Sequence, residues 1–162
     1  MTTAIALSIV IVNWNTRDLL AQCLESVGSG QATAGNKLWT AHCLPPTEVI
    51  VVDNASSDGS ALMVRERFPW VQLIENTENV GFAQANNQAI QTAAGRYVLL
   101  LNSDTVVHPG ALAILVEFMG VHPLAGACGA RLLNADGSLQ PACHPMLTPE
   151  REFHRLLFLE RI

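Results

Sequence analysis

The sequence predicts an α/β fold of three layers, with helices on both faces of a central and mostly parallel β-sheet. Residues 7–12, 48–52 and 97–101 are short apolar runs without polar alternation. Such runs are typical of strands that are buried on both faces, and these occur mainly in parallel sheets. Segments with helical spacing separate the runs, and right-handed crossovers between parallel strands place their helices on both faces of the sheet.

The first strand and helix are predicted from residues 7–27. The strand is rich in β-branched side chains, and Thr16 is a candidate N-cap for the helix that follows. Apolar residues then recur at helical spacing at Leu19, Leu20, Cys23, Leu24 and Val27. Residues 28–46 are rich in Gly, Ser, Thr, Ala and Pro without a clear period, which predicts a surface excursion before the second strand.

The second and third strands are predicted at residues 48–52 and 71–74. Residues 53–60, which follow the second strand, favour caps and turns. A helix with an apolar inner face comes next, and it is expected to stop before Pro69. Residues 75–81 are polar and predict a turn after the third strand.

The second half of the chain continues the alternation of helix and strand. Residues 82–93 predict a helix closed by Gly95, and Pro109 suits the first turn of a helix that ends before Pro123. An Asp-Gly step at residues 136–137 predicts a small β-hairpin near the C-terminus. The two strands of this hairpin are expected at residues 127–133 and 139–143.

Composition excludes several classes of protein. With 14 acidic and 9 basic residues the formal net charge is −5, which argues against a nucleic-acid partner. The four cysteines contain no Cys-x-x-Cys pair, so neither a zinc ribbon nor a disulfide framework is indicated. No basic residue precedes the apolar run at 4–12, and no run approaches the about 20 residues of a membrane span. A cytoplasmic chain is therefore expected.

The polar residues that follow the strand at 97–101 are candidates for binding chemistry. In open α/β sheets ligands bind beyond the carboxyl ends of the strands, and Asn102, Ser103 and Asp104 stand at such an end. One carboxylate and one neutral oxygen are too few to hold a divalent cation, but they suffice when a diphosphate supplies further oxygens. The alternative is that these residues only cap the next helix.

Three polar clusters follow three of the predicted strands, at residues 13–15, 53–56 and 102–104. Together with the segment 79–87 they resemble, in order and spacing, the motifs of the family 2 glycosyltransferases, which are nucleotide-sugar-dependent enzymes of the GT-A fold. The resemblance covers nearly the whole chain. The amino-acid sequences of these motifs are similar to those of the branch that contains bacterial rhamnosyltransferases of cell-surface polysaccharides.

The resemblance implies a nucleotide-sugar site. Asp53 would accept the imide N–H of uracil or thymine, and Trp14 would lie against the base. Gly81 would allow close approach of the backbone. The residues expected to bind the nucleotide sugar are Asn13, Trp14, Asn15, Asp53, Asn54, Gly81, Asn86, Asn87, Asn102, Ser103 and Asp104. The alternatives are a turn or capping role for Asp53, a core position for Trp14 and a polar helix face for Asn86 and Asn87.

The resemblance also implies a divalent metal, Mg²⁺ or Mn²⁺, with Asp104 as its ligand. The family's Asp-x-Asp signature reads Asn102-Ser103-Asp104 in this sequence, so its first position is neutral. Asn102 is therefore expected to contact ribose or a metal-bound water, and metal affinity without the nucleotide is expected to be weak.

The activity that the resemblance implies is inverting transfer of a sugar from a UDP- or dTDP-sugar to a glycan or lipid-linked acceptor. The family's catalytic base lies in an acidic motif downstream of the hairpin, which this chain does not match, so the base is expected beyond Ile162. Two alternatives stay open. One is a noncatalytic nucleotide-sugar-binding module, and the other is a nucleotidyltransferase, although residues 15–18 are not the Gly-rich basic loop of that class.

Two parts of the chain are distinguished on this basis. Residues 1–147 are predicted to form the nucleotide-sugar-binding domain, and residues 148–162 a C-terminal helix that leads into an acceptor-binding region. Acidic and basic residues in that helix balance, whereas membrane-surface helices are enriched in Lys and Arg. Packing on further protein or self-association is therefore expected ahead of peripheral contact with the inner face of the membrane.

Overall fold

The computed structural model describes residues 4–29 and 45–141, which belong to two compact units. The first unit reaches Cys128, and the second begins at Gly129. The helix predicted at residues 148–162 lies outside the described residues, as does most of the excursion predicted at 28–46. No helix in the described ranges is long and apolar enough to cross a membrane.

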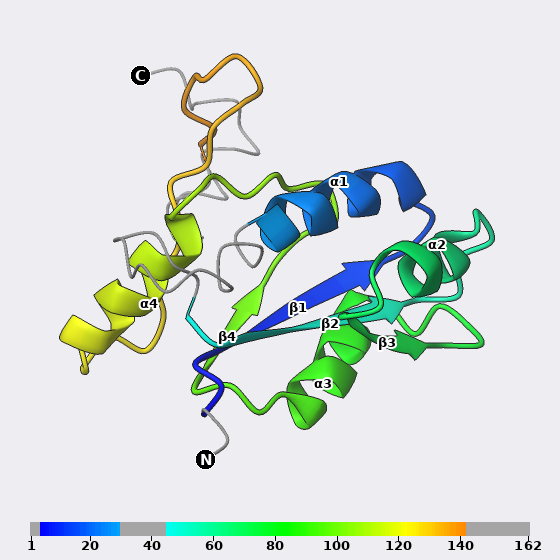
Figure 1. Ribbon diagram of the computed structural model, residues 1–162, viewed down its shortest axis with the longest axis horizontal. Coiled ribbons are helices and arrows are strands. Elements are labelled where there is room, and N and C mark those ends of the chain that lie inside the picture. Colours follow the sequence, from blue (N-terminus) through cyan, green and yellow to red (C-terminus); the bar gives the residue numbers. More distant parts are fainter. Residues whose placement is uncertain (1–3, 30–44, 142–162) are drawn as a thin grey trace, which may run out of the picture. The chain divides into compact units, whose positions relative to one another are not determined.

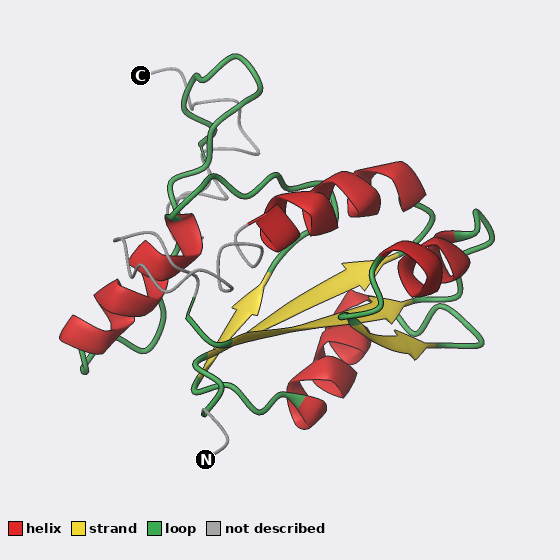
Figure 2. Ribbon diagram, viewed as in Figure 1, coloured by secondary structure: helices red, strands yellow, loops and turns green. Residues whose placement is uncertain are grey.

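The first unit is built on a four-stranded sheet, drawn as arrows in Figures 1 and 2. Its strands are β1 (Leu7–Asn13), β2 (Thr47–Asp53), β3 (Gln72–Glu75) and β4 (Tyr97–Leu100), and their order across the sheet is β3-β2-β1-β4. All three pairings are parallel. The α/β class and the parallel sheet predicted from the apolar runs are thus confirmed.

Helices cover both faces of this sheet. They are α1 (Arg17–Ser29), α2 (Ser60–Arg67), α3 (Phe82–Thr92) and α4 (Ala111–Val121). α1 and α2 lie on one face and α3 on the other, as Figure 1 shows. The larger core joins Ile9 and Ile11 to α1, α2 and the Leu112 side chain of α4, and the smaller core joins Val10 and Ile50 to α3.

The prediction that residues 97–101 are buried on both faces is wrong for this strand. β4 ends at Leu100, and its side chains alternate, with Leu99 packed against the larger core while Val98 and Leu100 are 43% and 51% exposed. In the described sheet β4 is an edge strand that pairs only with β1. Among the described elements α3 packs on β1 and β2, in the smaller core, to which β4 contributes no side chain.

The second unit contains the predicted turn. Leu133 and Leu139 form a single antiparallel bridge. The hairpin is therefore shorter than the one expected from the predicted strands at residues 127–133 and 139–143. Gly137 has a φ of 81°, and the Asp136 carboxylate accepts hydrogen bonds from the amide and the hydroxyl of Ser138. The Asp-Gly step therefore makes the turn that the sequence predicts.

Gly95 differs from its predicted role as the residue that closes a helix. α3 ends at Thr92 and is capped by Ala93. Gly95 instead lies against β1, where its N–H donates to the Ser8 hydroxyl at 2.8 Å. A Cβ on Gly95 would lie 2.5 Å from the Ser8 backbone nitrogen and 2.8 Å from the Leu7 carbonyl carbon. A glycine is needed here because two backbones approach closely.

Gly95→Ala is expected to destabilise the protein by about 1–3 kcal/mol, since the added methyl group overlaps with backbone that cannot move freely. Gly120→Ala in α4 is the matched control, because a Cβ at Gly120 meets nothing within 4 Å. The control is expected to be neutral or stabilising, as alanine favours a helix more than glycine. Urea unfolding of both variants measures the difference, and equal stabilities would contradict the close contact.

Candidate functional site

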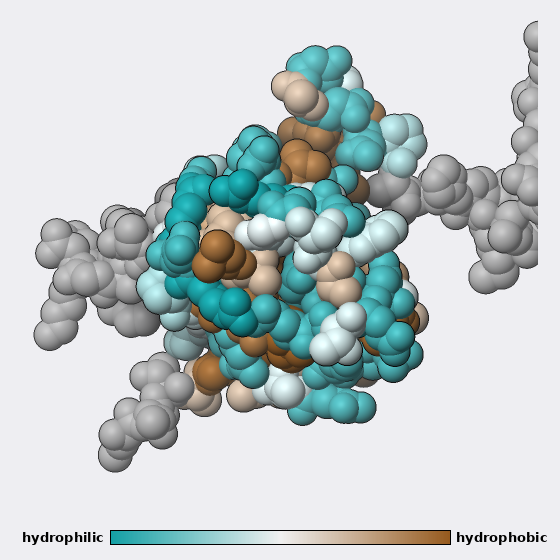
Figure 3. All heavy atoms as spheres, turned by 90° about the vertical axis from the view of Figure 1, so that its right-hand side faces the viewer, coloured by the Kyte–Doolittle hydropathy of each residue, from teal (hydrophilic) through white to brown (hydrophobic). Residues whose placement is uncertain are grey.

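Two of the predicted polar clusters meet at the carboxyl ends of β1 and β2. Asn13 and Asp53 are partners in the register of these strands, and the β1–α1 and β2–α2 loops extend from them. The strand ends lie at the right in Figure 1. Figure 3 views the chain from that side and shows a surface that is mostly hydrophilic, with hydrophobic residues exposed in several places between the hydrophilic ones.

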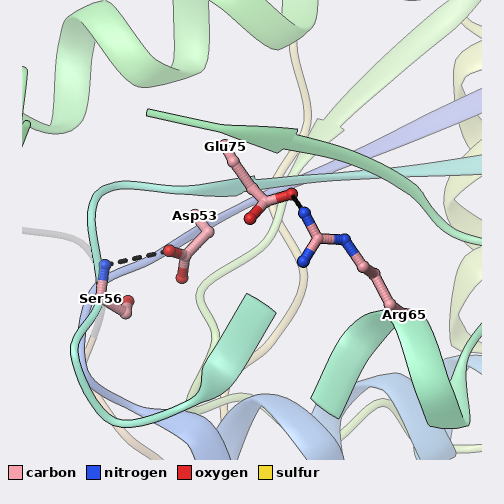
Figure 4. Close-up of polar contacts among 4 residues, drawn as sticks. All are labelled: Asp53, Ser56, Arg65 and Glu75. Carbon is pink, nitrogen blue, oxygen red and sulfur yellow. Dashed lines mark hydrogen bonds and ion pairs between the residues drawn. The ribbon is translucent and has the colours of Figure 1, made fainter. Parts of the chain in front are cut away.

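The Asp53 carboxylate is buried and held in one orientation. It is only 4% exposed, and it accepts a hydrogen bond from the Asn13 side-chain amide at 2.8 Å. It also accepts from the Ser56 N–H at 3.0 Å, the bond that Figure 4 draws. Each bond goes to a different oxygen of the carboxylate. A carboxylate has about four acceptor positions, so both oxygens keep capacity for a further donor.

A second carboxylate lies next to Asp53 on the neighbouring strand. Glu75 is the register partner of Asp53, and its side chain is paired with Arg65 of α2 (Figure 4). Both members of this ion pair are partly exposed, so its contribution to stability is small. Glu75 is thus engaged by the Arg65 guanidinium, whereas Asp53 accepts from Asn13 and from the Ser56 backbone.

The two loops are cross-linked beyond Asp53. The second amide N–H of Asn13 donates to the Ser56 hydroxyl at 3.0 Å, and the Asn15 N–H donates to the same hydroxyl at 2.9 Å. The Asn15 side-chain oxygen accepts from the Ser57 N–H at 2.8 Å. Asn15 and Ala55 have positive φ values of 54° and 63°, a conformation that asparagine tolerates better than alanine.

Trp14 lies at the same end of β1 and is 56% exposed. This exposure excludes the alternative in which Trp14 anchors the core, because a core tryptophan would bury its ring. An exposed aromatic side chain at this strand end is a surface on which a planar ring can stack. Stacking on Trp14 stays a prediction.

Asp58 joins the first turns of two helices. Its carboxylate accepts from the N–H of Arg17 at 2.8 Å, where α1 begins, and from the N–H of Ser60 at 3.0 Å, where α2 begins. Burial by itself disfavours the charged form, but hydrogen bonds from the Ser60 hydroxyl and from these amides outweigh it and lower the pKa of Asp58. The negative charge also suits both helix N-termini.

The loop between β3 and α3 is fixed by side-chain amides. The Asn54 oxygen accepts from the Val80 N–H at 3.0 Å, and its amide donates to the Asn79 oxygen at 2.7 Å. The same Asn79 oxygen accepts from the Gly81 N–H at 2.9 Å. Gly81 has a φ of 83° and a ψ of 162°, which only glycine adopts readily. Asn54 thus positions Gly81 through bonds within the protein.

Asn86 and Asn87 are not brought to Asp53 by any hydrogen bond among the described residues. Asn86 is buried, and its amide donates to the Phe82 carbonyl oxygen at 2.8 Å within α3. Asn87 is exposed. Both residues belong to α3, on the face of the sheet opposite α1 and α2 (Figure 1).

The loop that follows β4 is fastened along α1. The Ser103 and Thr16 hydroxyl oxygens are 2.9 Å apart, and the Asn102 carbonyl oxygen accepts from the Cys23 thiol at 3.7 Å. Further along, the Val107 N–H donates to the Ser26 hydroxyl at 3.0 Å. Burial, and to a smaller extent the charge of Asp104, raises the pKa of the Cys23 thiol to about 12, so the thiol keeps its proton.

Asp104 itself is exposed and makes no side-chain hydrogen bond or ion pair with the described residues. No cluster of three or more His, Cys, Asp or Glu side chains suited to a metal ion occurs in the described ranges. A free carboxylate with a neighbouring amide oxygen fits a hard cation only if further oxygens come from a phosphate. The residues present therefore fit a cation that is shared with a ligand.

Some residues of this network were not among the predicted site residues. Thr16, Ser57 and Asp58 carried the signal of helix caps and turns, and this signal does not show which partners their side chains select. Beside the network an open depression of about 360 Å³ is lined by Asn15, Thr16, Arg17, Asp18, Leu19 and Asp58.

Comparison with known proteins identifies relatives. The family model described as "Glycosyl transferase family 2" matches residues 8–158. The chain is 30% identical over 112 residues to an N-acetylglucosaminyl-diphospho-decaprenol L-rhamnosyltransferase of Mycobacterium tuberculosis, covering 62% of this chain and 36% of that protein. It is 32% identical over 138 residues to the putative teichuronic acid biosynthesis glycosyltransferase TuaG of Bacillus subtilis, covering 81% and 49%. The chain thus spans half or less of these two proteins.

Solved structures show the same fold. Residues 1–349 of S. aureus TarS match with a TM-score of 0.57 at 21% identity, covering 74% of this chain and 33% of that chain. The mannosyltransferase PcManGT of Pyrobaculum calidifontis, in complex with GDP-Man and Mn²⁺, matches with a TM-score of 0.58 at 27% identity, covering 73% and 33%.

Proposed function

Because the chain belongs to glycosyl transferase family 2, we propose that its first unit binds the donor of an enzyme that transfers a sugar from a UDP- or dTDP-sugar to a glycan or lipid-linked acceptor. The observation that carries this proposal is the buried Asp53 carboxylate, held by Asn13 and Ser56 at the carboxyl end of β2. Ligands of open α/β sheets bind at this edge.

Asp53 is proposed to recognise the base. Uracil and thymine present an imide N–H that a carboxylate accepts, whereas cytosine presents an acceptor at the same ring position. Trp14 is exposed and follows Asn13, the register partner of Asp53, and it would stack on the base, while Asn15 would lie near the ribose. Asn13 would act through Asp53, since both of its amide hydrogens are used in bonds to Asp53 and Ser56.

Asp104 is proposed to hold a divalent cation, Mg²⁺ or Mn²⁺, with Asn102 beside it. When bound, this cation would neutralise charge on the diphosphate leaving group. The support is the free, exposed carboxylate of Asp104 and the presence of Mn²⁺ with GDP-Man in the PcManGT structure. Gly81 and α3, with Asn86 and Asn87, would line the far side of the donor.

The catalytic base is proposed to lie beyond Ile162. Asp136 lies in the turn of the small hairpin and does not match the family's acidic motif downstream of that hairpin. The corresponding division of the chain is a donor-binding domain at residues 1–147 and a tail at 148–162 that leads to the acceptor side. A cytoplasmic location belongs to the same proposal, with self-association or peripheral membrane contact through the tail.

The test is a calorimetric titration with UDP, dTDP, CDP and GDP in Mn²⁺ and in EDTA. We expect UDP and dTDP to bind more tightly than CDP, and their binding to weaken in EDTA. No binding of any nucleoside diphosphate would overturn the proposal. A noncatalytic module predicts the same binding but no sugar transfer even when the acceptor side is present, so a transfer assay on a longer chain separates it from the enzyme.

A further inference from the structure

We propose that Thr16 is a positioning residue whose hydroxyl fixes the Asn102-Ser103-Asp104 loop relative to the Asp53 carboxylate. This role rests on the proposed donor site, in which Asp53 meets the base and Asp104 the cation. Thr16 is partly buried and lies between the two, with its hydroxyl oxygen 2.7 Å from the Asn13 side-chain oxygen and 2.9 Å from the Ser103 hydroxyl oxygen.

The single hydroxyl hydrogen of Thr16 determines which group donates in each of these two hydrogen bonds. The Asn13 side-chain oxygen has no hydrogen, so the single hydroxyl hydrogen of Thr16 must point to it. The Ser103 hydroxyl must then donate to Thr16, because Thr16 has no second hydrogen to offer. Asn13 in turn donates to Asp53. A continuous series of donors therefore runs from Ser103 through Thr16 and Asn13 to the Asp53 carboxylate.

The Thr16 hydroxyl is available for this role because another residue serves the helix N-terminus. A threonine that precedes a helix usually accepts from an N–H of the first turn. Here the Asp58 carboxylate accepts from the Arg17 N–H, and the Thr16 backbone carbonyl accepts from the Leu20 N–H. The Thr16 side chain is directed instead to Asn13 and to Ser103, which is 87 residues away in sequence.

The contact with Ser103 acts at the residue that separates Asn102 from Asp104. The other side-chain bonds from α1 to this loop reach the Asn102 carbonyl oxygen and the Val107 N–H, on either side of Ser103 and Asp104. Asp104 has no side-chain bond of its own among the described residues. The Thr105 N–H donates to the Asn102 carbonyl oxygen at 3.2 Å and closes a turn over Ser103 and Asp104. The bond between Thr16 and Ser103 joins this turn to the β1–α1 loop. It therefore helps to set the distance between Asp104 and Asp53 that one nucleotide must span.

The experiment compares the affinity for UDP in Mn²⁺ with that in EDTA, in the full chain. Thr16→Val keeps the shape of the side chain but removes the hydroxyl, Thr16→Ser keeps the hydroxyl, and Ser103→Ala removes the hydroxyl that donates to Thr16. We expect Thr16→Val and Ser103→Ala to reduce the gain in affinity from Mn²⁺ by about three- to tenfold, the scale of one hydrogen bond. Thr16→Ser is expected to restore the gain.

The double variant Thr16→Val/Ser103→Ala should lose no more than Thr16→Val alone, because Thr16→Val already removes the bond that Ser103→Ala breaks. A purely structural role would lower the affinities in Mn²⁺ and in EDTA equally, and that result would overturn the inference. If Thr16→Val fails to fold, Ser103→Ala decides alone. An unchanged Mn²⁺ gain in Ser103→Ala overturns the inference while leaving the proposed function intact, whereas a wild-type chain that binds no nucleotide overturns both.

Discussion

Asp104→Ala is expected to abolish the part of nucleoside diphosphate affinity that depends on a divalent cation. Asp104 is the carboxylate of the Asn102-Ser103-Asp104 loop, and Asn102 supplies only a neutral oxygen. Two phosphate groups carry negative charge that this loop cannot neutralise without a cation. The affinity of the variant in Mn²⁺ should therefore fall to the value that the wild-type chain shows in EDTA.

The matched control is Glu117→Ala, which removes an exposed carboxylate from α4 and changes the net charge equally. Its affinity in Mn²⁺ should equal that of the wild type, because general electrostatic effects of one charge are screened beyond about 10 Å. Isothermal titration with UDP measures the affinities of the wild type and of both variants in Mn²⁺, and that of the wild type in EDTA. A wild-type chain that binds UDP equally in both conditions would show that Asp104 holds no metal.

Asp53→Ala is expected to cost about 1.5–3 kcal/mol of affinity for uridine and thymidine nucleotides, the scale of a hydrogen bond to a charged group. The variant also leaves donors of Asn13 and Ser56 without their acceptor. Loss of a buried partner costs about 1–3 kcal/mol of stability, which is less than the total stability of a typical domain. The fold should therefore persist.

Ser56→Ala is the comparison for this prediction. It keeps the backbone N–H that donates to Asp53 but removes the hydroxyl that accepts from Asn13 and Asn15. Ser56→Ala should reduce the stability of the protein more than it reduces the preference for UDP over CDP. Affinities for UDP and CDP, with thermal unfolding beside them, separate the two roles. One outcome would show that Asp53 is a turn residue only. In that outcome Asp53→Ala destabilises the fold severely, and the protein that does refold still prefers UDP to CDP as the wild type does.

Much of the sheet follows from local sequence. Residues 7–12 and 48–52 are apolar without alternation, and β1 and β2 are buried centrally as this pattern predicts. The GT-A fold implied by the resemblance is likewise confirmed by the family match and the solved structures. The similar run at 97–101 led to a wrong prediction for the burial of β4. A run of apolar residues does not show whether its strand lies at the centre or at the edge of the sheet.

The interior of the site could not be predicted in the same way. The bonds of Asn13 to Asp53 and of Arg17 to Asp58 join residues 40 and 41 positions apart, and the bond of Thr16 to Ser103 spans 87. Serine, threonine, asparagine and aspartate have many partners within reach in a loop, so their sequence signal is that of a turn. The register of β1 against β2 selects which of these partners meet.

The shared carboxylate of Asp58 has a consequence for local unfolding. It accepts from the first N–H of α1 and from the first N–H of α2, so neither helix can fray at this end without releasing a bond that also orients the other. Helix ends normally open independently and at little cost. We therefore expect the two N-termini to open as one cooperative unit, with their amide hydrogens protected from exchange together while Asp58 is ionised.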